Sequence, residues 1–534
     1  MLLIAVSALP WFLALGNEVQ DIDSAQYADV ARLMVRDGQW LTMRDSSGPF
    51  INKPPLAIWA QAAAISVLGA TSAAAHLPSL IFAALTVAAT FGLGRALLDV
   101  QRGSIAACLL ASSVALQQMV ADPKVDLALT AMATLSLWAF VEGRKRSGYL
   151  WLGWLFAGLA VLAKGPLGLA LPAAAIFPEA IRHHWGQAEK GTLRQRLFAL
   201  KPMRGLLIVA ALAAPYYWAI YQRDGAANAG FVLWQQNIGR LIGQSGYANA
   251  TTPLFFFHTA LWVFLPFTPL LALGTLRPAL PRLPFEPRVL WWGFWIPFAA
   301  FSASTYKLPQ YIYCLSPVAA LIAADALVAL KNVQPLRKGM LALGGVSGLA
   351  VAWMMIDAFP PENAAVVIIA LLAAAALPIA AWKLRTEASW QATASTVAAV
   401  AAIHVAYVGW LFPHAIAFQP GKAVADRAFA EDPKATRLPY VGTRPSFAAA
   451  YYYRGPSTER MGPEELSERV ARGEQNTVVV ETGVWPDFAA VGLEATLIQH
   501  FDAYPTSRAR LPFWRASTRA SQLQGRDLLR VKAR

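Results

Sequence analysis

Charged side chains are scarce in this sequence. Of its 534 residues, 14% are Asp, Glu, Lys or Arg and 57% are hydrophobic, and the mean hydropathy is +0.43. Soluble domains carry about 25% charged residues, so this composition excludes an ordinary soluble protein. Long apolar runs instead predict an all-α polytopic membrane protein.

Thiol ligands and nucleotide-binding motifs are also scarce or missing. The two cysteines, Cys108 and Cys314, lie in apolar runs, which favours buried core positions over a disulfide or a metal–thiolate site. The seven histidines have no ligand spacing that predicts a metal centre. The sequence has no Walker-type glycine-rich loop and no dinucleotide fingerprint, which disfavours an ATP-driven pump.

About 13 apolar runs within residues 1–413 are long enough, or nearly so, to cross a hydrocarbon core. The expected spans are 1–16, 76–98, 103–120, 124–141, 149–164, 166–181, 205–222, 253–275, 289–304, 308–330, 339–357, 363–382 and 389–412. We expect the first to be a retained helix, because it has no basic leader and no small-residue cleavage site. The apolar run 56–69 is too short for a span and predicts an interfacial or partly re-entrant helix.

The basic residues indicate the orientation. The net charge of +14 comes mostly from short loops between the apolar runs, among them 144–146, 182–204 and 331–338. Such basic loops usually remain in the cytoplasm. The sequence has no soluble basic domain, so the positive charge does not indicate nucleic-acid binding. The loop 17–55 and the C-terminal part then lie on the opposite side. Residues 414–534 have lower hydropathy and mixed helix-like and strand-like pieces, which predict a small soluble α/β domain.

Several charged residues lie at the non-cytoplasmic ends of their segments. They are Asp21, Asp23, Lys53, Asp122, Asp126, Lys164, Arg240 and Lys307. A single such charge usually extends to the lipid headgroups, but eight on one face predict a site. A carboxylate can accept the proton of an attacking hydroxyl while cations stabilise a departing phosphate, which suits group transfer from a lipid phosphate. Asp23 is the expected base, unless it only caps the helix that it begins.

Short motifs along residues 17–330 resemble one family in order and spacing. They are Asp23 with Tyr27 and Ala28, Gly38 with Trp40, Lys53-Pro54-Pro55 with Trp59 and Gln61, Asp126 with Leu127 and Leu129, Lys164-Gly165-Pro166 with Pro172, Asn237 to Arg240, and Lys307-Leu308-Pro309 with Tyr311. The chain thereby resembles ArnT-type lipid-to-lipid glycosyltransferases, which are GT-C enzymes related to the protein O-mannosyltransferases.

The resemblance implies a sugar donor on polyprenyl (undecaprenyl) phosphate and inverting transfer at the periplasmic face of a bacterial inner membrane. The acceptor would be a hydroxyl of lipid A, lipopolysaccharide or another glycan. Asp23 and Asp126 would be the catalytic carboxylates, with Asp23 as the base, although Asp122 competes for the second position. Lys53, Arg240, Lys307 and Tyr311 would bind the donor phosphate, with Asp21, Tyr27, Lys164 and Asn237 as further site residues. We expect a monomer, with membrane lipids as its other partners.

Some family positions differ here. Ser24, Gln26 and Asn52 replace a Glu, an Arg and a second Glu, and no His precedes Pro253, so donor identity and metal dependence stay open. A divalent ion shared by Asp21 and Asp23 is one expectation. The aromatic runs at Phe255-Phe256-Phe257 and at Trp291, Trp292 and Trp295 predict an interfacial belt or a groove for the polyprenyl tail.

Three other functions remain open from sequence. Transfer to protein Ser or Thr, as in the O-mannosyltransferases, is the first alternative. A flippase for a polyprenyl lipid is the second, although it predicts internal repeats and midplane charges that the sequence does not show. A non-catalytic protein that keeps the fold is the third.

Overall fold

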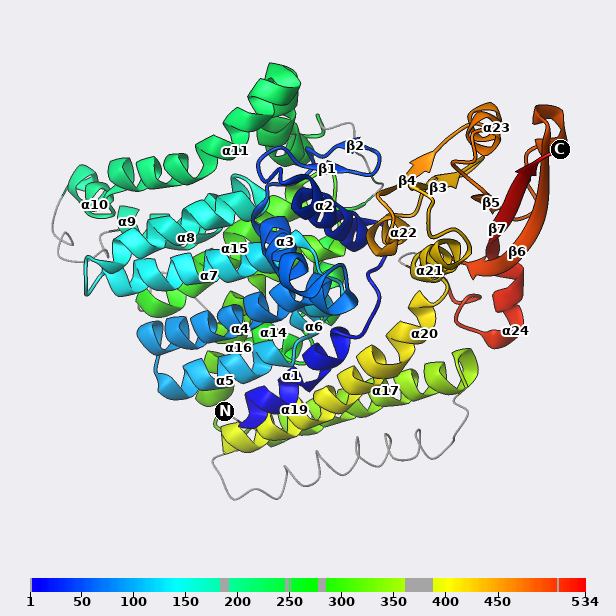
Figure 1. Ribbon diagram of the computed structural model, residues 1–534. Helices are drawn as coiled ribbons and strands as arrows, with labels where there is room; N and C mark the ends of the chain where they lie inside the picture. The colour runs from blue at the N-terminus through cyan, green and yellow to red at the C-terminus, as the bar shows by residue number, and fades with distance from the viewer. Residues whose placement is uncertain are drawn as a thin grey trace.

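The computed structural model describes residues 2–182, 192–244, 249, 251–276, 285–360, 388–506 and 509–534. It has a body of packed helices and a smaller part with a β-sheet at one end of that body (Figure 1). Within the described residues, six helices are long and apolar enough to cross a membrane, or seven if the bent pair α5 and α6 counts as one span. The chain is thus a mostly helical protein of the expected multi-pass kind.

The helical body is built from these elements. They are α1 (Leu2–Ala14), α2 (Asp23–Asp37), β1 (Arg44–Asp45), β2 (Gly48–Pro49), α3 (Leu56–Leu68), α4 (Ser72–Leu97), α5 (Val100–Ala111), α6 (Val114–Ala121), α7 (Val125–Gly143), α8 (Tyr149–Lys164), α9 (Leu167–Ile181), α10 (Leu193–Ala199), α11 (Pro202–Gly230), η2 (Phe231–Gly239), α12 (Arg240–Ile242), α13 (Phe255–Val263), α14 (Thr268–Thr275), α15 (Phe285–Ala303), η4 (Pro309–Leu315), α16 (Ser316–Ala329), α17 (Gln334–Ala358), α19 (Ala388–Ala406), η5 (Tyr407–Leu411) and α20 (Phe412–Ile416).

The expected count of 13 spans is not confirmed. The run 253–275 is divided into α13 and α14 at a break that contains Pro266, whose nitrogen cannot donate to a helix. Helices α1, α8 and α9 have 13, 16 and 15 residues, fewer than the roughly 20 of a full span. The run 363–382 lies outside the described residues. Helix α3 has 13 residues, in line with the short helix expected after Pro54 and Pro55.

Small residues let the helices of the body pack closely. A Cβ on Gly94 of α4 would lie 2.5 Å from the Cα of Gly103 in α5, so these two helices touch backbone to backbone. A Cβ on Gly168 of α9 would lie 2.2 Å from the carbonyl carbon of Ala160 in α8. Close contact at glycine and alanine is typical of helices that associate in a bilayer.

The C-terminal part contains a mixed five-stranded sheet in the order β4-β3-β5-β7-β6. Its elements are α21 (Gly421–Glu431), β3 (Arg437–Tyr440), α22 (Phe447–Tyr452), β4 (Ser457–Arg460), α23 (Pro463–Ala471), β5 (Thr477–Glu481), η6 (Phe488–Val491), β6 (Leu493–Ala503), α24 (Ala516–Arg519), η8 (Ala520–Gln522) and β7 (Gln524–Ala533). Strands β3, β4 and β5 are parallel, whereas β7 is antiparallel to both β5 and β6.

The two faces of this sheet have different partners. Val478 and Val480 of β5 belong to a small core with Leu466 of α23, whereas Val479 and its neighbour Leu528 belong to the large core that continues into the helical body. This alternation follows from the two-residue period of a strand. The sheet is therefore anchored to the helices through one face.

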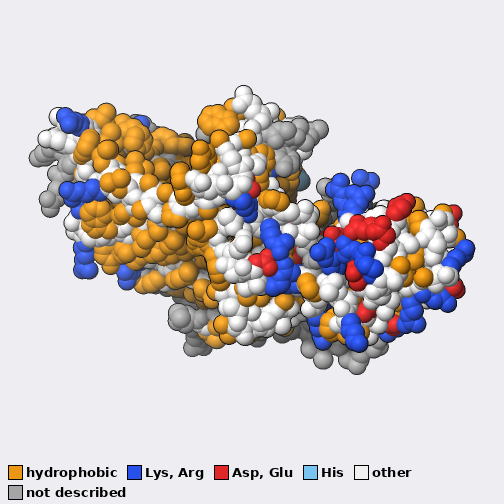
Figure 2. Space-filling view, turned by 45° about the horizontal axis from the view of Figure 1, so that its top comes forward, with side chains coloured by type: hydrophobic (Ala, Val, Ile, Leu, Met, Phe, Trp, Pro, Cys, Tyr) orange, Lys and Arg blue, Asp and Glu red, His pale blue; other side chains and the backbone are white. Residues whose placement is uncertain are grey.

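The surface has two regions of different character. On the face shown in Figure 2, apolar side chains cover much of the helical body, and acidic and basic side chains gather over the C-terminal part. More Lys and Arg side chains lie at the far end of the helical body, opposite the sheet (Figure 2). The turn between α7 and α8 lies at that far end, whereas α2 begins at the end that meets the sheet (Figure 1).

Candidate functional site

Asp23 lies at the start of α2 and faces a polar cavity of about 220 Å³. The N-cap of α2 is Ile22, and no side chain caps the helix, so the alternative role of Asp23 as a cap is not observed. Its side chain is 48% exposed, in contrast to the mostly buried residues around it. An accessible carboxylate at a cavity can accept a proton from a ligand.

The same cavity collects most of the expected site residues. Its lining comprises Asp23, Gln26, Tyr27, Asn52, Lys53, Asp126, Lys164, Arg240, Tyr306, Leu308, Gln310 and Tyr311. These residues come from α2, the loop before α3, α7, α8, α12, the segment before η4, and η4 itself. Elements separated by up to 288 residues thus contribute to one chemical surface, from Asp23 to Tyr311.

The charged groups of the cavity form specific pairs. The Lys164 ammonium contacts the Asp126 carboxylate, with their side chains 14% and 9% exposed, so this ion pair is largely shielded from solvent. Arg240 donates a 3.1 Å hydrogen bond to the Tyr311 hydroxyl, and its guanidinium lies 5.4 Å from the Tyr306 ring centroid. The pairing of Asp126 with a lysine distinguishes it from Asp23, whose carboxylate remains more open.

Burial and neighbouring cations lower the pKa of Lys53 to about 7; Arg240 and Lys164 are the principal cations. The pKa of Tyr27 is instead raised well above its ordinary value, first by burial and then by Asp23 and Asp126, so its hydroxyl remains a hydrogen-bond donor. A lysine that titrates near neutrality beside two other cations marks a site prepared for an anion.

A second cavity of about 380 Å³ adjoins the polar one and shares Asn52, Lys53, Lys164, Arg240 and Tyr311 with it. Beyond these shared residues its lining is mostly apolar. The further lining residues are Pro54, Pro166, Leu167, Ala170, Val232, Gln236, Asn237, Ala300, Phe301 and Ser304. The combined shape suits an amphipathic ligand with an anionic head at the shared cations and a hydrocarbon tail beyond them.

The turn between α8 and α9 depends on Gly165. This residue has φ +69°, a conformation that other residues rarely adopt, and a Cβ there would lie 3.0 Å from the side-chain nitrogen of Asn237. The turn therefore brings Lys164 into the cavity and places Asn237 against the backbone. The Asn237 amide donates to the carbonyls of Val232 and Leu233, at 2.9 and 3.3 Å, within η2.

Asp21 does not share a site with Asp23. Its carboxylate accepts hydrogen bonds from the Ser446 hydroxyl at 2.5 Å and the Ala448 nitrogen at 3.0 Å. It lines a different cavity, against the C-terminal part, where burial raises its pKa. The two carboxylates thus line different cavities, and the Asp21 oxygens bind the C-terminal part, so the structure does not bring Asp21 and Asp23 together as a shared ion site.

Lys307 also differs from the expectation. Its side chain is 4% exposed and its ammonium donates to the Thr251 hydroxyl at 3.4 Å, while Asn249 accepts from its backbone nitrogen at 3.1 Å. It does not line either of the two joined cavities. The neighbouring Tyr306 occupies that place, since the chain is irregular before η4 and a periodic face could not be assigned from sequence.

The aromatic runs do not form the apolar cavity either. Neither Phe255-Phe256-Phe257 nor Trp291, Trp292 and Trp295 belongs to its lining, where Phe301 is the one aromatic ring that carries no polar group. The rings of each run contact one another, as in the Trp291–Trp292 pair at 5.0 Å and the Phe255–Phe256 pair at 5.1 Å. Phe256 also lies 6.3 Å from the Phe301 ring of the cavity, so this run is behind the lining and not part of it.

Lys124 is the charged residue that the sequence analysis missed. Its ammonium lies 2.6 Å from Asp122 and 3.9 Å from Asp23, and the Ser24 hydroxyl donates to the same Asp122 carboxylate. Asp122 is therefore a neighbour of Asp23 without lining the cavity. Lys124 could have been identified from the sequence, because it lies between the two candidate acids Asp122 and Asp126.

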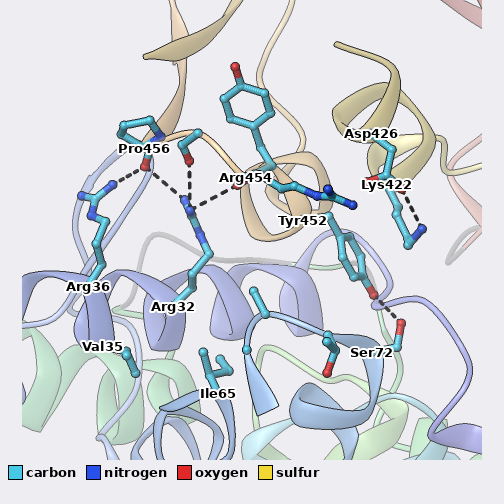
Figure 3. A pocket seen from close by; sticks show the side chains of 15 residues that line it. Arg32, Val35, Arg36, Ile65, Ser72, Lys422, Asp426, Tyr452, Arg454 and Pro456 are labelled. Carbon is cyan, nitrogen blue, oxygen red and sulfur yellow. Dashed lines mark hydrogen bonds and ion pairs between the residues drawn. The ribbon is translucent and has the colours of Figure 1, made fainter. Parts of the chain in front are cut away.

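A groove of about 760 Å³ lies between α2, the connection from α3 to α4, and the C-terminal part (Figure 3). Arg32 donates to the carbonyl groups of Tyr453, Gly455 and Pro456 at 3.4 Å each, and Arg36 also donates to Pro456. Both arginines point from α2 toward this segment (Figure 3). The hydrogen bonds from these two guanidinium groups hold the C-terminal part against α2. The groove therefore lies at the interface between the helical body and the C-terminal part.

Three comparisons relate the chain to known proteins. Residues 52–222 match the model of a family described as dolichyl-phosphate-mannose-protein mannosyltransferase. An undecaprenyl phosphate-alpha-4-amino-4-deoxy-L-arabinose arabinosyl transferase of Pseudomonas aeruginosa is 30% identical over 399 residues, which are 69% of each chain. An uncharacterized protein of Aquifex aeolicus is 28% identical over 340 residues, 61% of this chain and 63% of that one. The matches thus span about two thirds of these relatives.

The fold is also similar to a solved structure. The crystal structure of ArnT from Cupriavidus metallidurans bound to undecaprenyl phosphate superposes with a TM-score of 0.79 at 18% identity, and covers 99% of this chain and 97% of that one. Its apo form gives a TM-score of 0.77. The similarity includes the C-terminal sheet, because it extends over nearly the whole chain.

Proposed function

This chain belongs to the family of undecaprenyl phosphate-aminoarabinose arabinosyl transferases and has their GT-C fold, and we propose that it is a sugar transferase of the same kind. It is a multi-pass glycosyltransferase of a bacterial inner membrane. Its donor is a sugar on polyprenyl phosphate, and its acceptor is a hydroxyl of lipid A or another glycan. The observation that carries this proposal is the pair of joined cavities, one polar with an open carboxylate and one apolar, which share three cations.

The donor phosphate binds where the two cavities meet. Lys53 and Arg240 face that point, and the Tyr311 hydroxyl is held by Arg240 at 3.1 Å. The polyprenyl chain extends along the apolar lining at Leu167 and Phe301. The sugar then lies in the polar cavity beside Asp23, since its carrier phosphate is held at the other side of the same space.

Asp23 accepts the proton of the acceptor hydroxyl as its oxygen forms a bond to the anomeric carbon. The bond between that carbon and the phosphate oxygen breaks, and the phosphate keeps the electron pair. Attack from the side opposite the phosphate inverts the anomeric centre. The cations stabilise the growing negative charge of the leaving phosphate, a contribution that is large in a site shielded from water. Asp126 and Lys164 act as a buried pair that holds this cation cluster in place.

The reaction takes place on the periplasmic side. Support comes from the basic side chains at the far end of the helical body (Figure 2) and from the start of α2, which contains Asp23, at the end that meets the sheet (Figure 1). Residues 1–413 form the membrane domain, with the loop 17–55 and an interfacial helix to about residue 69. Residues 414–534 form a periplasmic domain, tied to that loop by Asp21.

Transfer to protein Ser or Thr is a second candidate, because residues 52–222 match the protein mannosyltransferase family model. The two candidates share the donor site and differ only in the acceptor. A lipid acceptor and a Ser/Thr peptide, offered separately with the same donor, distinguish them.

The test uses purified protein in detergent with radiolabelled polyprenyl-phosphate sugars and a bacterial lipid extract. We expect Asp23→Asn to lower the rate of transfer by about 100- to 10,000-fold, the range associated with a general base. Donor binding should change little, because Asp23 does not hold the phosphate. Asp37→Asn, on the same helix with its carboxylate paired to Arg36 and Arg44, is the matched control. Unchanged transfer by Asp23→Asn would refute the assignment of the base.

A further inference from the structure

Lys124 occupies the break between α6 and α7, next to the start of α2. Pro123 precedes it, and Lys124 itself is extended with φ −114° and ψ 173°, so α7 begins only at Val125. This geometry turns the Lys124 side chain toward the two carboxylates of Asp122 and Asp23. The side chains of Lys124, Asp122 and Asp23 are 24%, 17% and 48% exposed, so the charges interact with only partial screening.

The two contacts of the Lys124 ammonium are unequal. At 2.6 Å from Asp122 it makes a charged hydrogen bond, and the Ser24 hydroxyl holds that carboxylate from α2. At 3.9 Å from Asp23 it is too distant for a hydrogen bond, yet close enough for attraction. The Asp23 oxygens are thus attracted toward Lys124 while they remain available to a ligand.

We propose that Lys124 is a positioning residue that aims the Asp23 carboxylate at the acceptor hydroxyl. Ser24 and Asp122 hold the ammonium, and the ammonium holds Asp23 electrostatically. Burial lowers the pKa of Lys124, but the negative charges of Asp122 and Asp23 raise it by a larger amount. The net pKa is therefore above its ordinary value, and the lysine stays charged. The inference rests on the proposed function, because it assigns a role in the same proton transfer.

The same arrangement does not fit a divalent ion beside Asp23. Within the described residues, no group of three His, Cys, Asp or Glu side chains converges to hold a metal. An ion between Asp23 and Asp122 would also meet the Lys124 ammonium, which already lies 2.6 Å from Asp122 and 3.9 Å from Asp23 and would repel it. Lys124 therefore provides the positive charge at Asp23 from within the chain.

The test compares Lys124→Met, which keeps the length of the side chain and removes its charge, with Lys124→Arg. We expect Lys124→Met to lower kcat by about 10- to 100-fold, because a small displacement of a catalytic group costs this much. The KM for the donor should change less than about twofold, since Lys124 lies outside the donor-phosphate site. Lys124→Arg should restore most of the lost rate. Lys145→Met, at an exposed lysine between α7 and α8, is the matched control.

Ser24→Ala is a milder variant that releases Asp122 without removing a charge. It should lower kcat several-fold and leave thermal unfolding nearly unchanged, which guards against a loss of folding in Lys124→Met. Wild-type transfer should also persist in EDTA.

Full kcat in Lys124→Met alongside an inactive Asp23→Asn would overturn the inference and leave the proposed function intact. Loss of wild-type transfer in EDTA, with recovery on adding a divalent ion, would overturn it as well. A wild-type protein that transfers no sugar would overturn the proposed function and this inference with it.

Discussion

Donor binding should depend on pH through Lys53. Its pKa is lowered to about 7 by burial and by the nearby cations of Arg240 and Lys164. The donor phosphate is a diester with one negative charge that does not titrate near neutrality. The protonated lysine attracts this charge, whereas the neutral amine does not, so binding should weaken as the pH rises through 7.

The magnitude follows from the protonated fraction. With a pKa of about 7, the free protein holds the Lys53 proton in about nine of ten molecules at pH 6 and in about one of ten at pH 8. If only the protonated form binds, the apparent Kd rises by about 10-fold between these values, which corresponds to about 1.4 kcal/mol. Tyr27 does not contribute, because its pKa is raised well above this range.

Isothermal titration of a polyprenyl-phosphate sugar into the detergent-solubilised protein at pH 6, 7 and 8 measures this change. Lys53→Arg carries a charge at every pH and should give a flat profile, and Lys53→Gln should be flat and weak throughout. At pH 8 the wild type should also take up nearly one proton on binding, visible as a dependence on the ionisation enthalpy of the buffer. A wild-type Kd that is constant from pH 6 to 8, or an equal dependence in Lys53→Arg, would refute the reasoning.

Two further predictions concern stability. Arg32→Ala should lower the free energy of unfolding by about 3 kcal/mol, because Asp29 is fully buried and loses its ion-pair partner at 3.5 Å. Thermal unfolding measures this loss, and limited proteolysis reports whether the C-terminal part is released. An unchanged cleavage pattern would argue against Arg32 as a contact that holds the C-terminal part. Glu179→Ala should cost about 3–5 kcal/mol, because this buried carboxylate accepts two hydrogen bonds from Arg288 at 3.0 and 2.9 Å. Glu474→Ala, at an exposed position paired with the exposed Arg472, should leave the melting temperature nearly unchanged, and an equal loss in both glutamate variants would contradict the role of burial.

The sequence predicted the class of fold and much of the site. Hydropathy alone identified a multi-pass helical protein, because the bilayer imposes a length and composition on each span. Asp23, Lys53 and Arg240 were found from their places at segment ends, and all three line the polar cavity. The run 253–275 was predicted as one span but forms two short helices, α13 and α14, because hydropathy is insensitive to a helix break at Pro266.

The direction of each side chain could not be predicted where the chain is irregular. Asp21 and Asp23 are two residues apart, yet one faces the C-terminal part and the other faces the cavity. Lys307 and Tyr306 are adjacent, and the tyrosine lines the site. No helical or strand period extends over these segments, so spacing in sequence carries no information about facing.

The sequence by itself determined that this protein crosses a membrane and which charges lie at the ends of its apolar segments, because the energetic cost of burying charge in lipid leaves a pattern that composition reveals. Only the tertiary structure decided how these charges are paired. Asp126 is neutralised by Lys164, whereas Asp23 remains open with Lys124 at 3.9 Å. Such pairing depends on distances between elements far apart in the chain, and an interaction that falls off with distance cannot be read from the order of residues.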